Sequence, residues 1–114
     1  MDKEADMEIP PASTPIACDM TNARDTPAER LAEYRRLFTR ALATRERTAI
    51  GIRFRFRAEP GVEAWVRDLA AREKACCAFF GFAIAVEDGQ VCWDVAVPDT
   101  APAKAVLEDF YALA

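Results

Sequence analysis

The chain has 114 residues, with 15 lysines and arginines, 19 aspartates and glutamates, and no histidine. Its composition, 52% apolar and 30% charged, is that of a soluble single-domain protein. No apolar run approaches the roughly 20 residues that cross a bilayer, which argues against a membrane protein. The missing histidine excludes imidazole bases, Cys/His nucleophilic pairs and mixed Cys/His zinc fingers. Thiols, carboxylates, arginines and two tyrosines remain for chemistry.

The first residues are acidic and show no secretory signal, so we expect a cytoplasmic protein whose four cysteines stay reduced. The net charge of −4 argues against a dedicated nucleic-acid binder. Residues 1–15 contain three prolines and few apolar side chains, which predicts a disordered leader before a single domain over 16–114. Residues 15–20, at the junction of leader and domain, are considered as a short extended edge piece.

Residues 26–29 (Thr-Pro-Ala-Glu) open the first expected element. They combine a threonine N-cap, a proline at the first helical position and a capping-box glutamate, and apolar residues then recur at helical spacing. A helix is therefore expected over 27–43, with Arg30, Arg36 and Arg40 on the face opposite its apolar stripe. Residues 48–57 alternate apolar with polar side chains, which predicts a strand. A second helix is expected from Pro60-Gly61 to about residue 78.

We expect the remaining third of the domain to form a β-hairpin and a last helix. Asp88-Gly89 is a two-residue turn signal between two alternating segments. A register that opposes Val86 with Val91 places the large apolar side chains of both strands on one face. The helix follows from Thr100. The order α-β-α-β-β-α predicts the α+β class: a two-layer sandwich of an antiparallel sheet, with three or four strands, and three helices.

Arg53, Arg55 and Arg57 line one face of the first predicted strand. A groove for an anionic ligand is one interpretation. The favoured one is an outer sheet face whose arginines meet acids such as Asp94 or Glu87. Cys92 is expected on that outer face too, and its presence there is interpreted as incidental.

Glu73 is the clearest local inconsistency in the sequence. Successive helical residues turn by about 100°, so Glu73 falls in the middle of the apolar face of the second helix, one turn from Cys76 and Cys77. A buried carboxylate without a partner is costly. The position therefore calls for a partner or a function.

The first interpretation is a soft-metal or metalloid site, with Cys18, Glu73, Cys76 and Cys77 as the candidate ligands. Thiolates select ions such as Cu(I), Hg(II), Zn(II) or trivalent arsenic. Adjacent helical side chains diverge, so Cys76 and Cys77 cannot easily hold one ion unless the helix frays at that point. Cys18, in an extended arm between prolines, is the candidate third thiol. Binding of such an ion is the function we expect, and a homo-oligomer is left open.

Two other interpretations compete with the metal site. A thiol enzyme or redox protein would use Cys76 and Cys77, with Glu73 as proton acceptor. A disulfide between these neighbours is disfavoured in a helix, whereas a pairing of Cys18 with either thiol stays open. Alternatively, the cysteines are small apolar filler in an interaction module, and Glu73 pairs with an arginine such as Arg53 or reaches solvent.

Several segments together resemble a group of small, uncharacterised bacterial proteins. They are Ile16-Ala17-Cys18, the alternating stretch over 52–56, and Glu73-x-x-Cys76-Cys77-x-Phe79 followed by the hairpin. The resemblance covers most of residues 16–113. It implies that Cys18, Glu73, Cys76 and Cys77 belong together, and it suggests a heavy-metal-responsive context. It supplies no substrate, and Cys92 lies outside the pattern.

Overall fold

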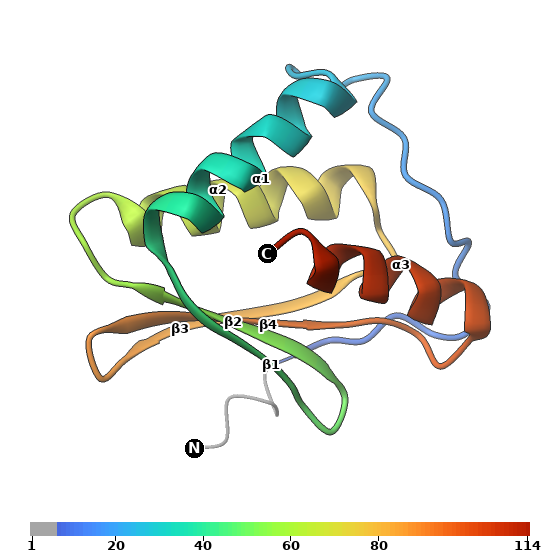
Figure 1. Cartoon of the computed structure of the whole chain (residues 1–114). Helices are drawn as coiled ribbons and strands as arrows, with labels where there is room; N and C mark the ends of the chain where they lie inside the picture. Colours follow the sequence, from blue (N-terminus) through green and yellow to red (C-terminus); the bar gives the residue numbers. More distant parts are fainter. Residues whose placement is uncertain (1–6) are drawn as a thin grey trace.

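Three helices cover one face of a four-stranded antiparallel sheet in the computed structural model, which describes residues 7–114 (Figure 1). The strand order across the sheet is β1-β2-β4-β3. The predicted α+β sandwich is confirmed. Its elements are α1 (Pro27–Ala41), β1 (Leu42–Arg47), β2 (Gly51–Arg57), α2 (Val62–Cys76), β3 (Gly81–Glu87), β4 (Gln90–Ala96) and α3 (Ala101–Ala112).

The fourth strand is β1, which the sequence did not predict. The first helix ends at Ala41, and the next six residues pair antiparallel with β2 as an edge strand. Thr48 closes the turn between them, because its backbone N–H donates to the Gly51 carbonyl and its hydroxyl accepts from the Gly51 N–H. Residues 15–20 form no strand, so the edge piece considered there is wrong.

The β3–β4 hairpin has the predicted register, with Val86 opposite Val91 and Ile84 opposite Trp93. Its turn is Asp88-Gly89, and both residues have positive φ, as this tight turn requires. Strand β4 lies between β2 and β3, so its Trp93 is completely buried against the helices. An aromatic core forms there from side chains of α1, α3 and the strands β2, β3 and β4, namely Tyr34, Phe38, Phe54, Phe82, Trp93 and Phe110.

Residues 8 and 9 pack against the outer face of the sheet. A Cβ atom on Gly81 would lie 2.5 Å from the Glu8 carbonyl oxygen, so glycine permits this close approach. Arg53 also lies on the outer face and pairs with Asp94, with 2.5 Å between Nε and Oδ1, as the favoured interpretation of these arginines predicted. The disordered leader over 1–15 stays a prediction, and residues 1–6 lie outside the described part. Of residues 7–114, no helix has the length and apolarity to cross a membrane.

Candidate functional site

The end of α2 separates the two neighbouring cysteines. The helix stops at Cys76, two residues before its predicted end, and Cys77 caps it with φ −123° and ψ 79°, outside helical geometry. The Cys77 N–H still donates to the Glu73 carbonyl, at 2.8 Å. Lys74 donates to the carbonyls of Ala78 and Phe80 and so stabilises the turn that follows. Cys77 is therefore buried, with 2% of its surface exposed, while Cys76 is half-buried on another side.

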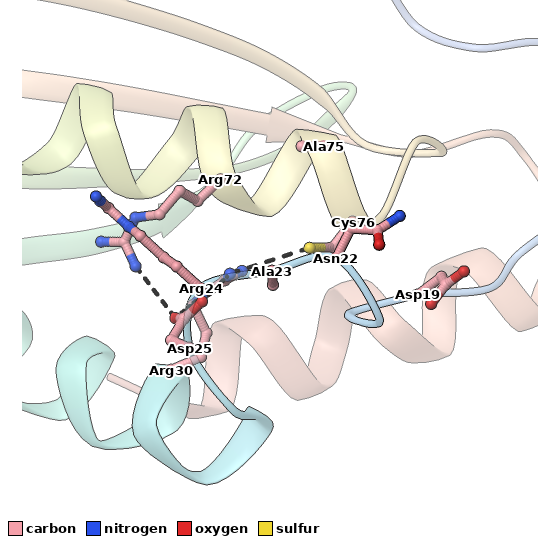
Figure 2. Close-up of a pocket in the computed structure, with 9 residues that line it drawn as sticks. All are labelled: Asp19, Asn22, Ala23, Arg24, Asp25, Arg30, Arg72, Ala75 and Cys76. Atoms are coloured by element: carbon pink, nitrogen blue, oxygen red, sulfur yellow. Dashed lines mark hydrogen bonds and ion pairs between the residues drawn. The ribbon is translucent and has the colours of Figure 1, made fainter.

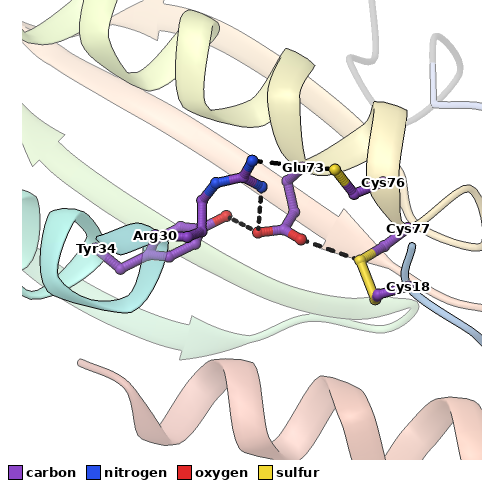
Figure 3. The surroundings of a disulfide bond; sticks show 6 residues. All are labelled: Cys18, Arg30, Tyr34, Glu73, Cys76 and Cys77. Atoms are coloured by element: carbon purple, nitrogen blue, oxygen red, sulfur yellow. Dashed lines mark hydrogen bonds and ion pairs between the residues drawn. A yellow bond between two sulfur atoms is a disulfide. The ribbon is translucent and has the colours of Figure 1, made fainter. Parts of the chain in front are cut away.

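Residues 16–25, which we call the arm, run past this helix end. Ile16 packs against the core, and the Asp19 N–H donates to the Cys76 carbonyl at 2.9 Å. Between these contacts, Cys18 forms a disulfide with Cys77 (Figure 3). The prediction of four reduced cysteines is therefore wrong for this structure, because the arm brings Cys18 directly onto Cys77. This pairing is one of the two that the sequence left open.

Glu73 lies between the disulfide and α1 (Figure 3). Its Oε1 accepts a hydrogen bond of 2.6 Å from the Tyr34 hydroxyl, and its Oε2 lies 3.1 Å from Cys77 Sγ. In the disulfide Cys77 Sγ carries no proton, so the second contact is not a hydrogen bond. A Cys77 thiol formed by reduction would find an acceptor at that distance.

Arg30 supplies the cation that Glu73 needs. It is only 4% exposed, which corrects the prediction that it lies opposite the apolar stripe of its helix. Its Nη1 lies 3.6 Å from Glu73 Oε1, and its Nε and Nη2 donate to both oxygens of Asp25 at 2.6 and 2.8 Å. Glu73 therefore pairs with Arg30 rather than with Arg53. The Arg30 hydrogen bonds hold the pKa of Asp25 down, at about 2.

Tyr34 fixes the other side of the carboxylate. Its side chain is 3% exposed, and burial, reinforced by the negative charge of Glu73, raises its pKa well above the usual value. The phenol thus keeps its proton and donates it to Oε1. One carboxylate oxygen is held by Tyr34 and Arg30, and the other faces the sulfur of Cys77. Such an arrangement suits a proton acceptor for a thiol.

Two cavities open beside these cysteines. The first, which we call the disulfide pocket, has a volume of about 190 Å³ and is lined by Cys18, Tyr34, Glu73, Cys77, Phe80, Val106, Asp109, Phe110 and Leu113. The second, of about 430 Å³, contains Cys76 together with Asp25, Arg30 and Arg72 (Figure 2). There, Arg30 Nη2 lies 4.0 Å from Cys76 Sγ. The two adjacent cysteines therefore face different cavities.

Three of the four predicted metal ligands come together. One oxygen of Glu73 and the sulfurs of Cys18 and Cys77 lie within 4.8 Å of one another. Cys76 is not part of this group. The two sulfurs are bonded to each other, so they could offer thiolates to an ion only after reduction.

Cys92 lies on the outer face of the sheet, as predicted. It is fully buried, with Arg55 Nη1 at 3.4 Å and Glu87 Oε1 at 3.6 Å from its sulfur. Asp25, Arg30 and Tyr34 were not predicted as site residues. A signal for Arg30 was present, because Arg30 and Tyr34 are one helical turn apart and so share a face of α1.

Comparison with models of known protein families, with curated proteins and with solved structures finds no match to this chain. The resemblance to small bacterial proteins therefore stays a prediction. The chemistry of the disulfide and its neighbours is what supports a function.

Proposed function

We propose that the protein is a thiol–disulfide redox protein in which Cys18 and Cys77 form a reversible couple. The observation that carries this proposal is the Cys18–Cys77 disulfide lying against a Glu73 oxygen, 3.1 Å from Cys77 Sγ. The two sulfurs differ in access, since Cys18 is exposed and Cys77 is buried. Cys18 is then the sulfur that meets an outside reagent, and Cys77 is the sulfur that closes the protein disulfide.

The reaction partner is a small thiol or dithiol. In the reducing direction, its thiolate attacks Cys18 Sγ, the bond between Cys18 and Cys77 breaks, and Cys77 leaves as a thiolate that takes up a proton. A second thiolate then attacks the partner sulfur of the mixed disulfide, which releases Cys18 as a thiolate. Two partner thiols become one disulfide, and the protein disulfide becomes two thiols.

In the oxidising direction, Cys18 attacks a partner disulfide and expels one thiolate. Cys77 then gives its proton to Glu73 and attacks Cys18 Sγ, which expels the second partner thiol. The hydrogen bond from Tyr34 and the ion pair with Arg30 support this role, because they keep the carboxylate oriented while its free oxygen accepts the proton.

A redox titration tests the couple. The folded protein is equilibrated in buffers of reduced and oxidised dithiothreitol, quenched in acid, alkylated, and its thiols are counted by mass. We expect one two-electron transition that Cys18→Ser and Cys77→Ser both abolish and that Cys92→Ala preserves. A Cys18–Cys77 bond that stays intact in the folded protein at every buffer ratio would contradict the proposal.

Soft-metal or metalloid binding by the reduced form is a second candidate. It is favoured by the three ligand atoms within 4.8 Å of one another, a donor set that suits Cu(I), Hg(II) or Zn(II). Titration of the reduced protein with Hg(II) tests it. We expect one ion per chain, lost in Cys77→Ser and kept in Cys76→Ser. Equal binding by the Cys77→Ser variant would remove this candidate.

A further inference from the structure

We infer that the disulfide pocket takes the carbon chain of a small, uncharged, apolar dithiol, and that it disfavours anionic thiols. This inference rests on the redox function proposed above and names its class of partner. Cys18 and Cys77 both line the pocket. A molecule that bonds to Cys18 from this side therefore carries its remaining atoms into the pocket.

The size of the pocket limits the partner. A volume of about 190 Å³ holds roughly six chain atoms, if each takes about the 30 Å³ of a water molecule in the liquid. A dithiol with a chain of four carbons has six heavy atoms and fits. A tripeptide thiol is several times too large to enter as a whole.

The wall opposite the disulfide is largely apolar. Helix α3 contributes Val106 and Phe110, and its C-cap contributes Leu113, at helical spacing along one face; Phe80 lines the pocket as well. The end of α3 is held in place because Arg45 donates hydrogen bonds to the carbonyls of Tyr111 and Ala114. Methylene groups that displace water from this wall would gain free energy of binding, whereas hydroxyl groups would lose their hydrogen bonds to water on entering.

The charges around the pocket disfavour a negatively charged partner. Two carboxylates, Glu73 and Asp109, line it, and none of the described lining residues is a lysine or arginine. The nearby cation Arg30 is already engaged by Asp25 and Glu73. A partner carboxylate would therefore meet like charges. Of the two cavities beside the cysteines, the one around Cys76 is lined by arginines (Figure 2).

The test measures how fast four dithiols reduce the oxidised full-length protein, with each rate divided by the thiolate concentration and by the rate of the same reagent with a small model disulfide. Butanedithiol and dithiothreitol share a four-carbon chain and differ in two hydroxyl groups. Dimercaptopropanol and dimercaptosuccinate are both vicinal dithiols and differ in carboxylate charge and in size. The first pair tests apolarity. The second tests charge together with size, and the Asp109→Asn variant separates the two.

We expect butanedithiol to be at least about fivefold faster than dithiothreitol, and dimercaptosuccinate at least about tenfold slower than dimercaptopropanol. Asp109→Asn should recover part of the rate with dimercaptosuccinate. Glu108→Gln, on the same helix but paired with Arg47 outside the pocket, is the matched control and should not. In Val106→Thr, an isosteric change, the advantage of butanedithiol should shrink.

Rate ratios equal to those of the model disulfide, or a faster reaction with dimercaptosuccinate, would overturn this inference and leave the redox couple standing. If none of the four dithiols reduces the folded protein, the redox proposal fails, and the inference fails with it. A lower rate with every dithiol in Val106→Thr, without a change in their order, would also count against the apolar wall as the selecting element.

Discussion

Two cysteine clusters on opposite sides of the sheet combine the same chemical groups. On the helical side, Cys77 lies with Glu73 and Arg30, and on the outer side Cys92 lies with Glu87 and Arg55. In both, a buried sulfur lies within about 4 Å of a carboxylate oxygen. The first contains a disulfide, whose second sulfur the arm supplies from 59 residues away in sequence, whereas Cys92 forms no disulfide within the described residues 7–114. A thiol, a carboxylate and a guanidinium together do not suffice for disulfide chemistry.

The backbone explains why the second sulfur comes to one cluster and not to the other. Cys92 belongs to β4, where pairing with β2 and β3 on both sides fixes its position. Cys77 follows the last residue of α2, where the helix leaves its carbonyls free and the arm hydrogen-bonds to one of them. A helix end can therefore accept a crossing segment that a central strand excludes.

The largest effect is expected from breaking the disulfide. It closes a loop of 59 residues, and chain entropy alone would stabilise the fold by about 4 kcal/mol at most. Cys18→Ser should lose most of this free energy of unfolding, whereas Cys92→Ala should lose about 1 kcal/mol for a small cavity. Urea unfolding without reductant measures both. Equal losses in the two variants would contradict the contrast between the clusters.

The fold was largely predictable because its signals are local. The capping box of α1, the alternation in β2 and the Asp-Gly turn each act over a few residues. Strand β1 was missed because Leu-Ala-Thr-Arg-Glu-Arg carries little apolar alternation and directly follows a helix. It is a strand through its pairing with β2, a tertiary contact that local propensity does not report.

The site was predictable in part. The misplaced charge of Glu73 identified the region, and the divergence of neighbouring helical side chains agrees with the separation of Cys76 from Cys77. The cation beside Glu73 was assigned incorrectly, because Arg30 reaches it from a different helix, α1. The choice of Cys77 over Cys76 as partner of Cys18 depends on where α2 ends, and the sequence placed that end two residues too late.

Glu73→Gln should give the next largest effect. The glutamine can still accept from Tyr34, but Arg30 loses one of its two anionic partners while keeping Asp25, so we expect a loss of about 1–2 kcal/mol in stability. Oxidation of the reduced protein should slow about tenfold or more, because Cys77 loses its proton acceptor. Quenching the oxidation at successive times and counting the remaining thiols measures this rate.

Glu87→Gln is the matched change in the outer cluster and should leave the oxidation rate unchanged. If both variants oxidise at the rate of the unaltered protein, Glu73 has no role in the proton transfer. If both slow equally, the effect comes from the net charge of the molecule rather than from contact with Cys77.

The smallest effect is the pH dependence of stability that Asp25 contributes through its pairing with Arg30, beside Glu73 and Cys77 on the helical side of the sheet. The pKa of Asp25 is lowered from 3.8 to about 2 in the folded protein, chiefly by hydrogen bonds from Arg30. A carboxyl group whose pKa is lower in the folded state stabilises the fold fully above its ordinary pKa, and this contribution disappears as the pH falls toward the folded value. Above about pH 5, Asp25→Asn should therefore be less stable than the unaltered protein by about 1 kcal/mol, a figure reduced for partial exposure of the pair. The difference should narrow below about pH 4 and nearly vanish near pH 2.

Urea unfolding of both proteins at several acidic pH values measures this difference, with the disulfide intact because thiolates are scarce in acid. Other carboxylates titrate in the same range, but they contribute equally to both proteins and cancel in the difference. A difference that stays constant from pH 5 to the lowest pH would show that the Arg30–Asp25 pair holds the arm through shape and not through charge.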